Sequence, residues 1–196
     1  MTAAISIRPA RKADASDIAL LVNIAAHGGP ADGWAHEQDA TDTYNPIEVG
    51  RLQILREDGA FTWRNATMAE SDGEIVGMLL GYREPDVAGT ISPNAPPYLR
   101  PLYELEGEAA GMWFISMLGV YVPWRSKGVG SRLLDVAEQK ARETAASGIA
   151  LITEDINAGA RRLYERRGYA VSAKRPMVRF PNGRPHGQDW LLMVKE

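Results

Sequence analysis

Apolar residues recur along the chain in two rhythms, one typical of strands and the other typical of helices. Short apolar runs between turn residues predict strands over residues 5–9, 62–70, 74–82, 112–122, 149–154, 169–180 and 189–195. Apolar residues spaced three and four apart predict helices over residues 14–27, 46–58, 128–147 and 158–167. A polar loop is expected at residues 28–44, and an irregular stretch at residues 83–110, whose five prolines disfavour a continuous helix or a central strand.

The order of these elements, β-α-α-β-β-β-α-β-α-β-β, predicts an α/β (α+β) fold with a mixed sheet. Hairpin turns are expected at Ser71-Asp72-Gly73 and at Pro181-Asn182-Gly183. Because no repeat or linker divides the chain, we expect a single domain over residues 1–196. A hydrophobic content of 45% is enough for one sizeable core.

Composition narrows the classes of function. No run of about 18 apolar residues occurs, so no membrane span is expected, and the N-terminus lacks a signal pattern, which favours a cytoplasmic protein. The absence of cysteine excludes disulfides and an acyl-cysteine intermediate. The net charge of -3 does not imply binding to nucleic acid.

Charge is distributed unevenly along the chain. Residues 1–110 hold 8 basic and 17 acidic residues, a net charge of −9, whereas residues 111–196 hold 14 and 8, a net charge of +6. The basic half suits a ligand with several phosphates, and the acidic half suits a cationic amine. Solvated surface charge is the alternative interpretation of both.

One turn between a predicted strand and a predicted helix is rich in glycine and basic residues: Arg125, Ser126, Lys127, Gly128, Val129, Gly130 and Ser131. Backbone N–H groups at a helix start bind anions, and the two glycines let a ligand approach the backbone closely. The basic residues, with Arg132, add positive charge suited to phosphate. The turn therefore predicts a diphosphate site. It lacks the G-x-x-x-x-G-K-[S/T] spacing, and Leu133 occupies the third glycine position of G-x-G-x-x-G.

What remains is R-x-x-G-x-G, preceded by Leu118-Gly119-Val120. This pattern resembles the acyl-CoA pyrophosphate signature of the GNAT superfamily of N-acetyltransferases. About 30 residues on, the stretch from Asn157 to Tyr169 is similar to the superfamily's second signature, N-x-x-A-x-x-L-Y-E-x-x-G-[F/Y]. Both stretches follow predicted strands, and the predicted first strand and helix fit too, so the resemblance covers essentially the whole chain. One departure is Pro123, which lies one place nearer Arg125 than the superfamily's usual proline.

The resemblance implies a GNAT fold, with a mixed, mostly antiparallel central sheet of about seven strands and helices on both faces. It implies acetyl-CoA as co-substrate and no metal. The pantetheine arm would bind the backbone of Leu118, Gly119 and Val120, and the pyrophosphate would bind the turn from Arg125 to Ser131. Asn157 would cap its helix or contact the pantetheine amide. Dimerisation is common in the superfamily, which allows a homodimer.

Tyr164 is the candidate general acid. It follows Asn157 by seven residues, about two helical turns, so both lie on one helix face. A phenol has an ordinary pKa of about 10 and can donate a proton at neutral pH. The alternative is a tyrosine that only packs in the core.

The general base is harder to assign, because the predicted strand 112–122 contains no Asp or Glu. The candidates are Glu104, Glu106, Glu108 and Glu154. We favour Glu106, since its predicted loop leads directly into the donor-binding strand. The alternatives are a solvated acidic loop and a chain of water molecules that deprotonates the amine.

These observations predict an N-acetyltransferase that moves an acetyl group from acetyl-CoA to a primary amine, directly, in a ternary complex. The acidic first half favours a small cationic amine, and a protein N-terminus or lysine is the alternative acceptor. A non-catalytic acyl-CoA-binding regulatory module would keep the turn at residues 125–131 but would not need Tyr164. A nucleic-acid-binding domain would use the basic half, but the chain has no recognition motif for it.

Overall fold

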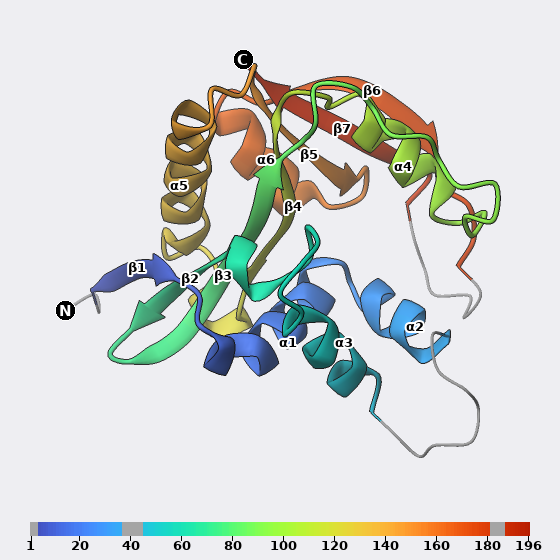
Figure 1. The fold of residues 1–196 in the computed structure, drawn as a ribbon. Coiled ribbons are helices and arrows are strands. Elements are labelled where there is room, and N and C mark those ends of the chain that lie inside the picture. Colours follow the sequence, from blue (N-terminus) through green and yellow to red (C-terminus); the bar gives the residue numbers. More distant parts are fainter. Residues whose placement is uncertain (1–3, 37–44, 181–186) are drawn as a thin grey trace. The chain divides into compact units, whose positions relative to one another are not determined.

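The computed structural model describes residues 4–36, 45–180 and 187–196 (Figure 1). Its strands are β1 (Ile5–Pro9), β2 (Ala66–Ser71), β3 (Glu74–Arg83), β4 (Trp113–Val120), β5 (Ile149–Glu154), β6 (Ala170–Pro176) and β7 (Asp189–Lys195). Its α-helices are α1 (Ala15–Ala25), α2 (Gly29–His36), α3 (Pro46–Ile54), α4 (Arg100–Gly107), α5 (Val129–Glu143) and α6 (Ala158–Arg166). Single 3-10 turns cover Lys12–Asp14, Trp63–Asn65 and Val122–Trp124.

The strands form a seven-stranded sheet in the order β1-β2-β3-β4-β5-β7-β6. The pairs β1–β2, β2–β3, β5–β7 and β6–β7 are antiparallel, whereas β4 pairs in parallel with β5. The parallel register joins Trp113–Ile115 to Ile149–Leu151. This mixed, mostly antiparallel sheet with flanking helices confirms the predicted fold class.

The chain divides into two compact units. The first comprises Met1–Gly81 and Met117–Val136, and the second comprises Tyr82–Ser116 and Ala137–Glu196. β3, β4 and α5 therefore each contribute residues to both units. The single domain expected from the sequence stays a prediction.

In the first unit, β2 and β3 form the predicted hairpin. Its two turn residues have left-handed backbones, with φ 51° at Asp72 and φ 82° at Gly73. A two-residue hairpin turn of this type needs a positive φ at both positions, which favours the Asp-Gly sequence. The predicted turn at residues 181–183 lies outside the described residues.

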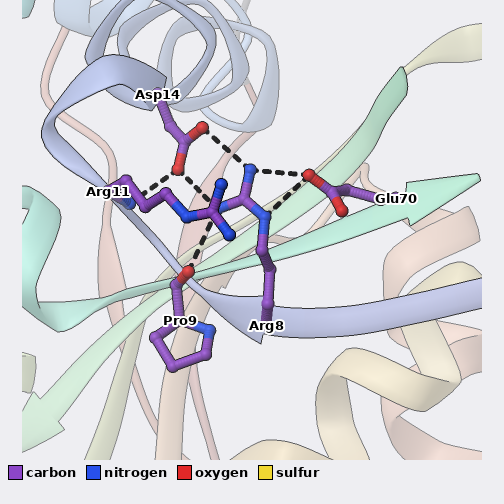
Figure 2. Close-up of polar contacts among 5 residues, drawn as sticks. All are labelled: Arg8, Pro9, Arg11, Asp14 and Glu70. Carbon is purple, nitrogen blue, oxygen red and sulfur yellow. Dashed lines mark hydrogen bonds and ion pairs between the residues drawn. The ribbon is translucent and has the colours of Figure 1, made fainter. Parts of the chain in front are cut away.

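An ion-pair network joins β1 to its neighbours in the same unit (Figure 2). Arg8 donates two hydrogen bonds to the Asp14 carboxylate, of 2.7 and 2.9 Å, and one of 2.7 Å to Glu70 on β2. It also donates to the carbonyl oxygen of Pro9. The Asp14 carboxylate accepts a further bond from the Arg11 backbone N–H. The network thus fixes the entry to α1 against β1 and β2.

The prediction of a loop at residues 28–44 is wrong for the first part of this range, which forms helix α2. The proline in the first turn suits a helix start because its φ is already helical and its missing N–H is not needed there. The Asn23 side chain also accepts a hydrogen bond of 3.0 Å from the Ala31 N–H. Trp34 is buried, so tertiary packing gives this polar segment an apolar anchor. Residues 37–44 lie outside the described residues.

The prediction of irregular structure at residues 83–110 is also wrong in part, because this range contains helix α4. Pro101 stands in the first turn of this helix, where proline is tolerated. Leu105 is fully buried and joins the core of the second unit with Phe114, Phe180 and Trp190. Within this unit α4 contacts β5, β6 and β7. The prolines therefore limit the helix to one end of the stretch.

Other boundaries differ by smaller amounts. Asn45 caps α3 by accepting a hydrogen bond of 3.0 Å from the Ile47 N–H. The helix predicted at residues 128–147 ends at Glu143. In the parts of the chain that the structure describes, no helix is long and apolar enough to cross a membrane.

Candidate active site

The glycine-rich turn of the first unit connects the 3-10 turn after β4 to α5. Ser126 and Gly128 both have left-handed backbones, with φ 60° and φ 86°. Such a conformation is uncommon for a residue other than glycine and often marks a functional segment. The first helical backbone bond runs from the Arg132 N–H to the Gly128 carbonyl, at 3.1 Å. The N–H groups of the intervening first turn lack intrahelical acceptors, as an anion site requires.

The start of α5 is anchored by its first residue. Val129 is 1% exposed, and a Cβ added to Gly77 on β3 would lie 2.9 Å from the Val129 side chain. The Tyr121 hydroxyl, just after β4, donates a hydrogen bond of 3.0 Å to Asp17 on α1. The turn is thus held at both ends, which keeps its backbone N–H groups in place.

The basic residues of the turn have different surroundings. Lys127 is exposed and its Nζ lies 5.0 Å from the centre of the Trp124 ring. Arg125 donates to the Val120 carbonyl at 3.2 Å. Arg132 donates to the carbonyl of Ile5 on β1 at 2.8 Å, so part of its donor capacity stabilises the fold.

The predicted pantetheine-binding residues Leu118, Gly119 and Val120 lie in the last part of β4. The pairing with β5 involves Trp113–Ile115, which precede them. Gly119 is closely covered by α1, because an added Cβ would lie 2.6 Å from the Leu21 carbonyl oxygen. The close packing of α1 therefore explains the glycine at position 119 without any bound ligand.

In the second unit, α6 carries the other two signature residues. The Asn157 side chain accepts a hydrogen bond of 3.3 Å from the Ala160 N–H, so it caps the helix. Tyr164 is buried and its ring centre lies 6.0 Å from that of Tyr169. Burial raises the pKa of the Tyr164 phenol to about 12, which keeps its proton in place at neutral pH. Among the described residues no side chain bonds to this hydroxyl, so the proton remains available for donation.

Glu106 lies in α4, not in a loop as the sequence suggested. Its Oε1 accepts a hydrogen bond of 2.8 Å from the hydroxyl of Tyr82, at the end of β3. Burial, followed by the negative charge of Glu106, raises the pKa of Tyr82 well above the ordinary value. Tyr82 therefore remains a hydrogen-bond donor to Glu106 throughout the physiological pH range.

Glu84 is a second carboxyl beside Glu106, and our sequence analysis missed it. Burial, and then the charge and hydrogen bond of Glu106, raise the pKa of Glu84 to about 7. A signal was available, because Tyr82 and Glu84 are two residues apart at the end of a strand and so share one face. The sequence could not show that Glu106 meets that face.

The other candidate bases have different surroundings. Arg175 on β6 forms ion pairs with Glu104, at 3.1 Å, and with Glu108. Glu154 is buried at the end of β5, in register with Trp190. Among the described residues no group of acidic or histidine side chains is arranged to hold a metal ion.

Comparison with known proteins shows which family has these features. Residues 31–169 match the acetyltransferase (GNAT) family. This range includes the glycine-rich turn and the Asn157–Tyr169 signature. The chain belongs to the GNAT acetyltransferase family. The comparison with curated proteins gave no match.

Solved structures agree with this GNAT fold. A crystal structure of an acetyltransferase is 21% identical, with a TM-score of 0.66, over 97% of this chain and 98% of that chain. An N-acetyltransferase from Staphylococcus aureus Mu50 is 13% identical, with a TM-score of 0.62, over 96% and 99%. A chain of the NatC complex bound to Gag peptide and CoA is 17% identical, with a TM-score of 0.55, over 97% of each. At these identities the likeness concerns the fold.

Proposed function

We propose that this GNAT chain transfers an acetyl group from acetyl-CoA to a primary amine, without a covalent enzyme intermediate. The observation that carries the proposal is the turn from Arg125 to Ser131. Its left-handed backbone at Ser126 and Gly128 precedes an anchored helix start with unused N–H groups. This arrangement fits a diphosphate, and the family match supports acetyl-CoA as the molecule that carries it.

In this proposal the turn binds the pyrophosphate through backbone N–H groups, and Lys127 adds positive charge. Each helix-terminus contact contributes roughly 0.3–1 kcal/mol, so several must act together. The backbone of Leu118, Gly119 and Val120 binds the pantetheine arm, and Asn157 contacts its amide or serves only as the cap. A similar solved structure supports the donor, since the NatC complex was solved with CoA.

Tyr164 is the proposed general acid. Its phenol keeps its proton up to about pH 12 and can transfer it to the leaving thiolate. The absence of cysteine from the chain favours direct attack of the amine on the thioester. Glu106 is the proposed general base, because it is a carboxyl in a partly buried setting with no ion-pair partner among the described residues.

The proposed acceptor is a small cationic amine. The acidic first 110 residues and the carboxyls of Glu84 and Glu106 suit a positive charge. A protein N-terminus or lysine is the alternative acceptor. A non-catalytic acyl-CoA-binding module is the alternative to an enzyme.

The test is CoA-thiol release from acetyl-CoA with a panel of small amines, polyamines, amino acids and peptides. We expect release that depends on one class of amine, and a fall of about ten- to a thousandfold in kcat for Tyr164→Phe, with the KM for acetyl-CoA nearly unchanged. Tyr103→Phe, on α4, is a matched control at an exposed tyrosine. Unchanged turnover in Tyr164→Phe would remove this residue from the mechanism. Binding of acetyl-CoA without release for any amine would favour the binding module.

A further inference from the structure

Two glutamates from separate segments of the second unit meet beside Tyr82. Glu84 directly follows β3, and Glu106 lies in α4. We propose that Glu84 and Glu106 hold one proton between them and act together as the base that deprotonates the acceptor amine. The proposal rests on the acetyltransferase function above, and it adds Glu84 as a second catalytic carboxyl.

The hydrogen bonds require a shared proton. An ionised carboxylate only accepts hydrogen bonds, so a bond between two carboxyl groups needs a proton on one of them. Glu84 and Glu106 are close enough to form such a bond. Glu84 Oε1 is buried, and no donor among the described residues reaches it. A proton on the pair meets this need without any further residue.

Tyr82 makes the pair asymmetric. Its hydroxyl donates to Glu106 Oε1 at 2.8 Å, and a donated hydrogen bond stabilises the ionised form of a carboxyl. Glu84 has no such donor among the described residues. The shared proton is therefore held mainly by Glu84, while Glu106 carries the negative charge. The raised pKa of Glu84, to about 7, agrees with this division.

Both carboxyls are held by backbone and ion-pair contacts. The Glu84 N–H donates to the Met112 carbonyl at 2.8 Å, which fixes the chain just after β3. Arg175 binds Glu104 and Glu108, which lie one turn apart on α4. Glu106 stands between them in sequence and points to a different side, toward Tyr82. Arg175 is thus a positioning residue for the pair.

Within residues 4–36, 45–180 and 187–196, the cations near the pair are bound to other groups. Arg83 donates to the Glu84 carbonyl oxygen at 3.1 Å and to the Asp86 carboxylate at 2.6 Å, so its guanidinium is bound elsewhere. On α4, Glu104 and Glu108 are matched by Arg175. The groups that act on the shared proton are therefore the two carboxyls and Tyr82. An ammonium group would supply the missing positive charge.

The proton transfer balances. Above the titration of the pair, both carboxyls are ionised, and an ammonium substrate gives one proton to the pair and becomes a neutral amine. The amine nitrogen then forms the bond to the acetyl carbon as the carbon–sulfur bond breaks. The thiolate takes its proton from Tyr164, and the nitrogen releases its second proton to water. Tyr164 then regains a proton from water. The pair returns its own proton to water before the next cycle.

The first test does not depend on activity. In protein labelled with ¹³C at the glutamate side-chain carboxyls, NMR titration should show one carboxyl that titrates near pH 7. We expect this signal to be lost in Glu84→Gln and to move to lower pH in Glu106→Gln, which keeps the burial of Glu84 but removes the neighbouring charge. Glu143→Gln is the matched control, because it removes an exposed carboxylate of α5 that pairs with Lys140. Wild-type protein without a carboxyl that titrates above about pH 6 would overturn the pairing.

The second test uses the acceptor found with the amine panel. In wild-type enzyme we expect kcat/KM to rise with pH through about 7, as the pair loses its proton. Glu84→Gln removes the carboxyl whose pKa is raised, so in this variant the rise should move to lower pH by at least about one unit. The plateau of kcat/KM should fall about tenfold or more. A rise that stays near pH 7 in Glu84→Gln would overturn the role of Glu84.

The experiments distinguish a failure of the proposed acetyltransferase function from a failure of the proposed Glu84–Glu106 pair. A shared-proton signal in a protein that acetylates no amine would contradict the proposed function and leave the pair in place. Amine acetylation without the signal would overturn the pair and leave the function. Circular dichroism checks that each variant folds, and Glu106→Gln supplies the same spectroscopic test if Glu84→Gln does not fold.

Discussion

Asp14 illustrates what a single side chain does in this fold. It is 6% exposed, yet it is charged, because Arg8 and the Arg11 N–H supply three hydrogen bonds to its carboxylate (Figure 2). The hydrogen bond from Arg8, above all, lowers the pKa of Asp14 below its ordinary value. Hydrogen bonds to charged groups contribute about 1.5–3 kcal/mol each when a partner is removed. The ionised Asp14 carboxylate therefore contributes to the free energy of unfolding.

We predict that Asp14→Asn lowers the free energy of unfolding by about 1.5–3 kcal/mol at pH 7. Because the folded pKa is depressed, the wild-type contribution is complete above the unfolded value of about 3.9. It is lost as pH falls through the lower folded pKa. Urea unfolding at pH 7 and near pH 3 should show the gap between wild type and variant closing in acid.

The control for this prediction is Asp72→Asn. Asp72 is an exposed carboxylate in the β2–β3 turn, where Asn also adopts the required backbone. It should change the free energy of unfolding by less than about 0.5 kcal/mol at either pH. A gap for Asp14→Asn that is equally large at both pH values would contradict the electrostatic explanation.

At the scale of elements, α2 and α3 depend on one close contact. A Cβ added to Gly50 on α3 would lie 2.4 Å from the ring of Trp34 on α2. The ring therefore occupies space that any other residue at position 50 would need. This contact explains how a polar segment, predicted to be a loop, becomes a helix in the first unit.

We predict that Gly50→Ala displaces the Trp34 ring and destabilises the protein by about 1–3 kcal/mol, as overpacking does. Gly33→Ala is the matched control, because this α2 glycine has open space around it. It should stabilise by up to about 1 kcal/mol through helix propensity and chain entropy. Urea unfolding followed by tryptophan fluorescence measures both. Equal stability of the two variants would mean that the Trp34 contact is unimportant.

At the scale of the whole molecule, the uneven charge of the sequence is partly compensated by ion pairs. In the acidic first 110 residues these include Lys12–Glu57, Arg51–Glu48, Arg64–Glu57, Arg83–Asp86 and the network around Arg8. Apart from the partly buried network around Arg8, these pairs are exposed and contribute little to stability, about 0–1 kcal/mol each. Their consequence is that the negative charge offered to a ligand is smaller than the sequence suggests.

Ligand binding should stabilise the molecule as a whole. At a concentration near 100 times its Kd, acetyl-CoA should add about 2.7 kcal/mol, which corresponds to a Tm rise of about 5–10 °C for a chain of this size. We predict that Gly128→Ala reduces this rise by at least half, because a left-handed backbone of φ 86° is strained with a Cβ. Thermal unfolding with and without acetyl-CoA measures it.

The matched control for that prediction is Gly73→Ala. Gly73 also has a left-handed backbone and open space, but it lies in the β2–β3 turn. Both variants should lose stability without ligand, and only Gly128→Ala should lose part of the acetyl-CoA effect. An equal ligand-induced rise in both would contradict the role of the turn in binding.

The sequence by itself determined the features that depend on neighbouring residues. Seven strands, the Asp72-Gly73 turn, the Asn45 and Asn157 caps and the helix after Gly128 follow from periodicity, turn chemistry and capping, all of which act over a few residues. The two signatures were also local, and they led to the family. The helices α2 and α4 were missed because prolines and polar residues hid their starts. Each is stabilised by a buried residue of its own, Trp34 or Leu105, that packs against other elements.

Only the tertiary structure decided which distant residues meet. Arg8 and Glu70 are 62 residues apart, and Tyr82 and Glu106 are 24 apart. Glu106 could be proposed as a base from its position before β4, but its contact with Tyr82 and Glu84 could not. Pairing across such distances depends on strand order and helix packing, which no local pattern encodes. The proton affinity of Glu84 is accordingly a property of the fold, since burial and a neighbouring carboxyl create it.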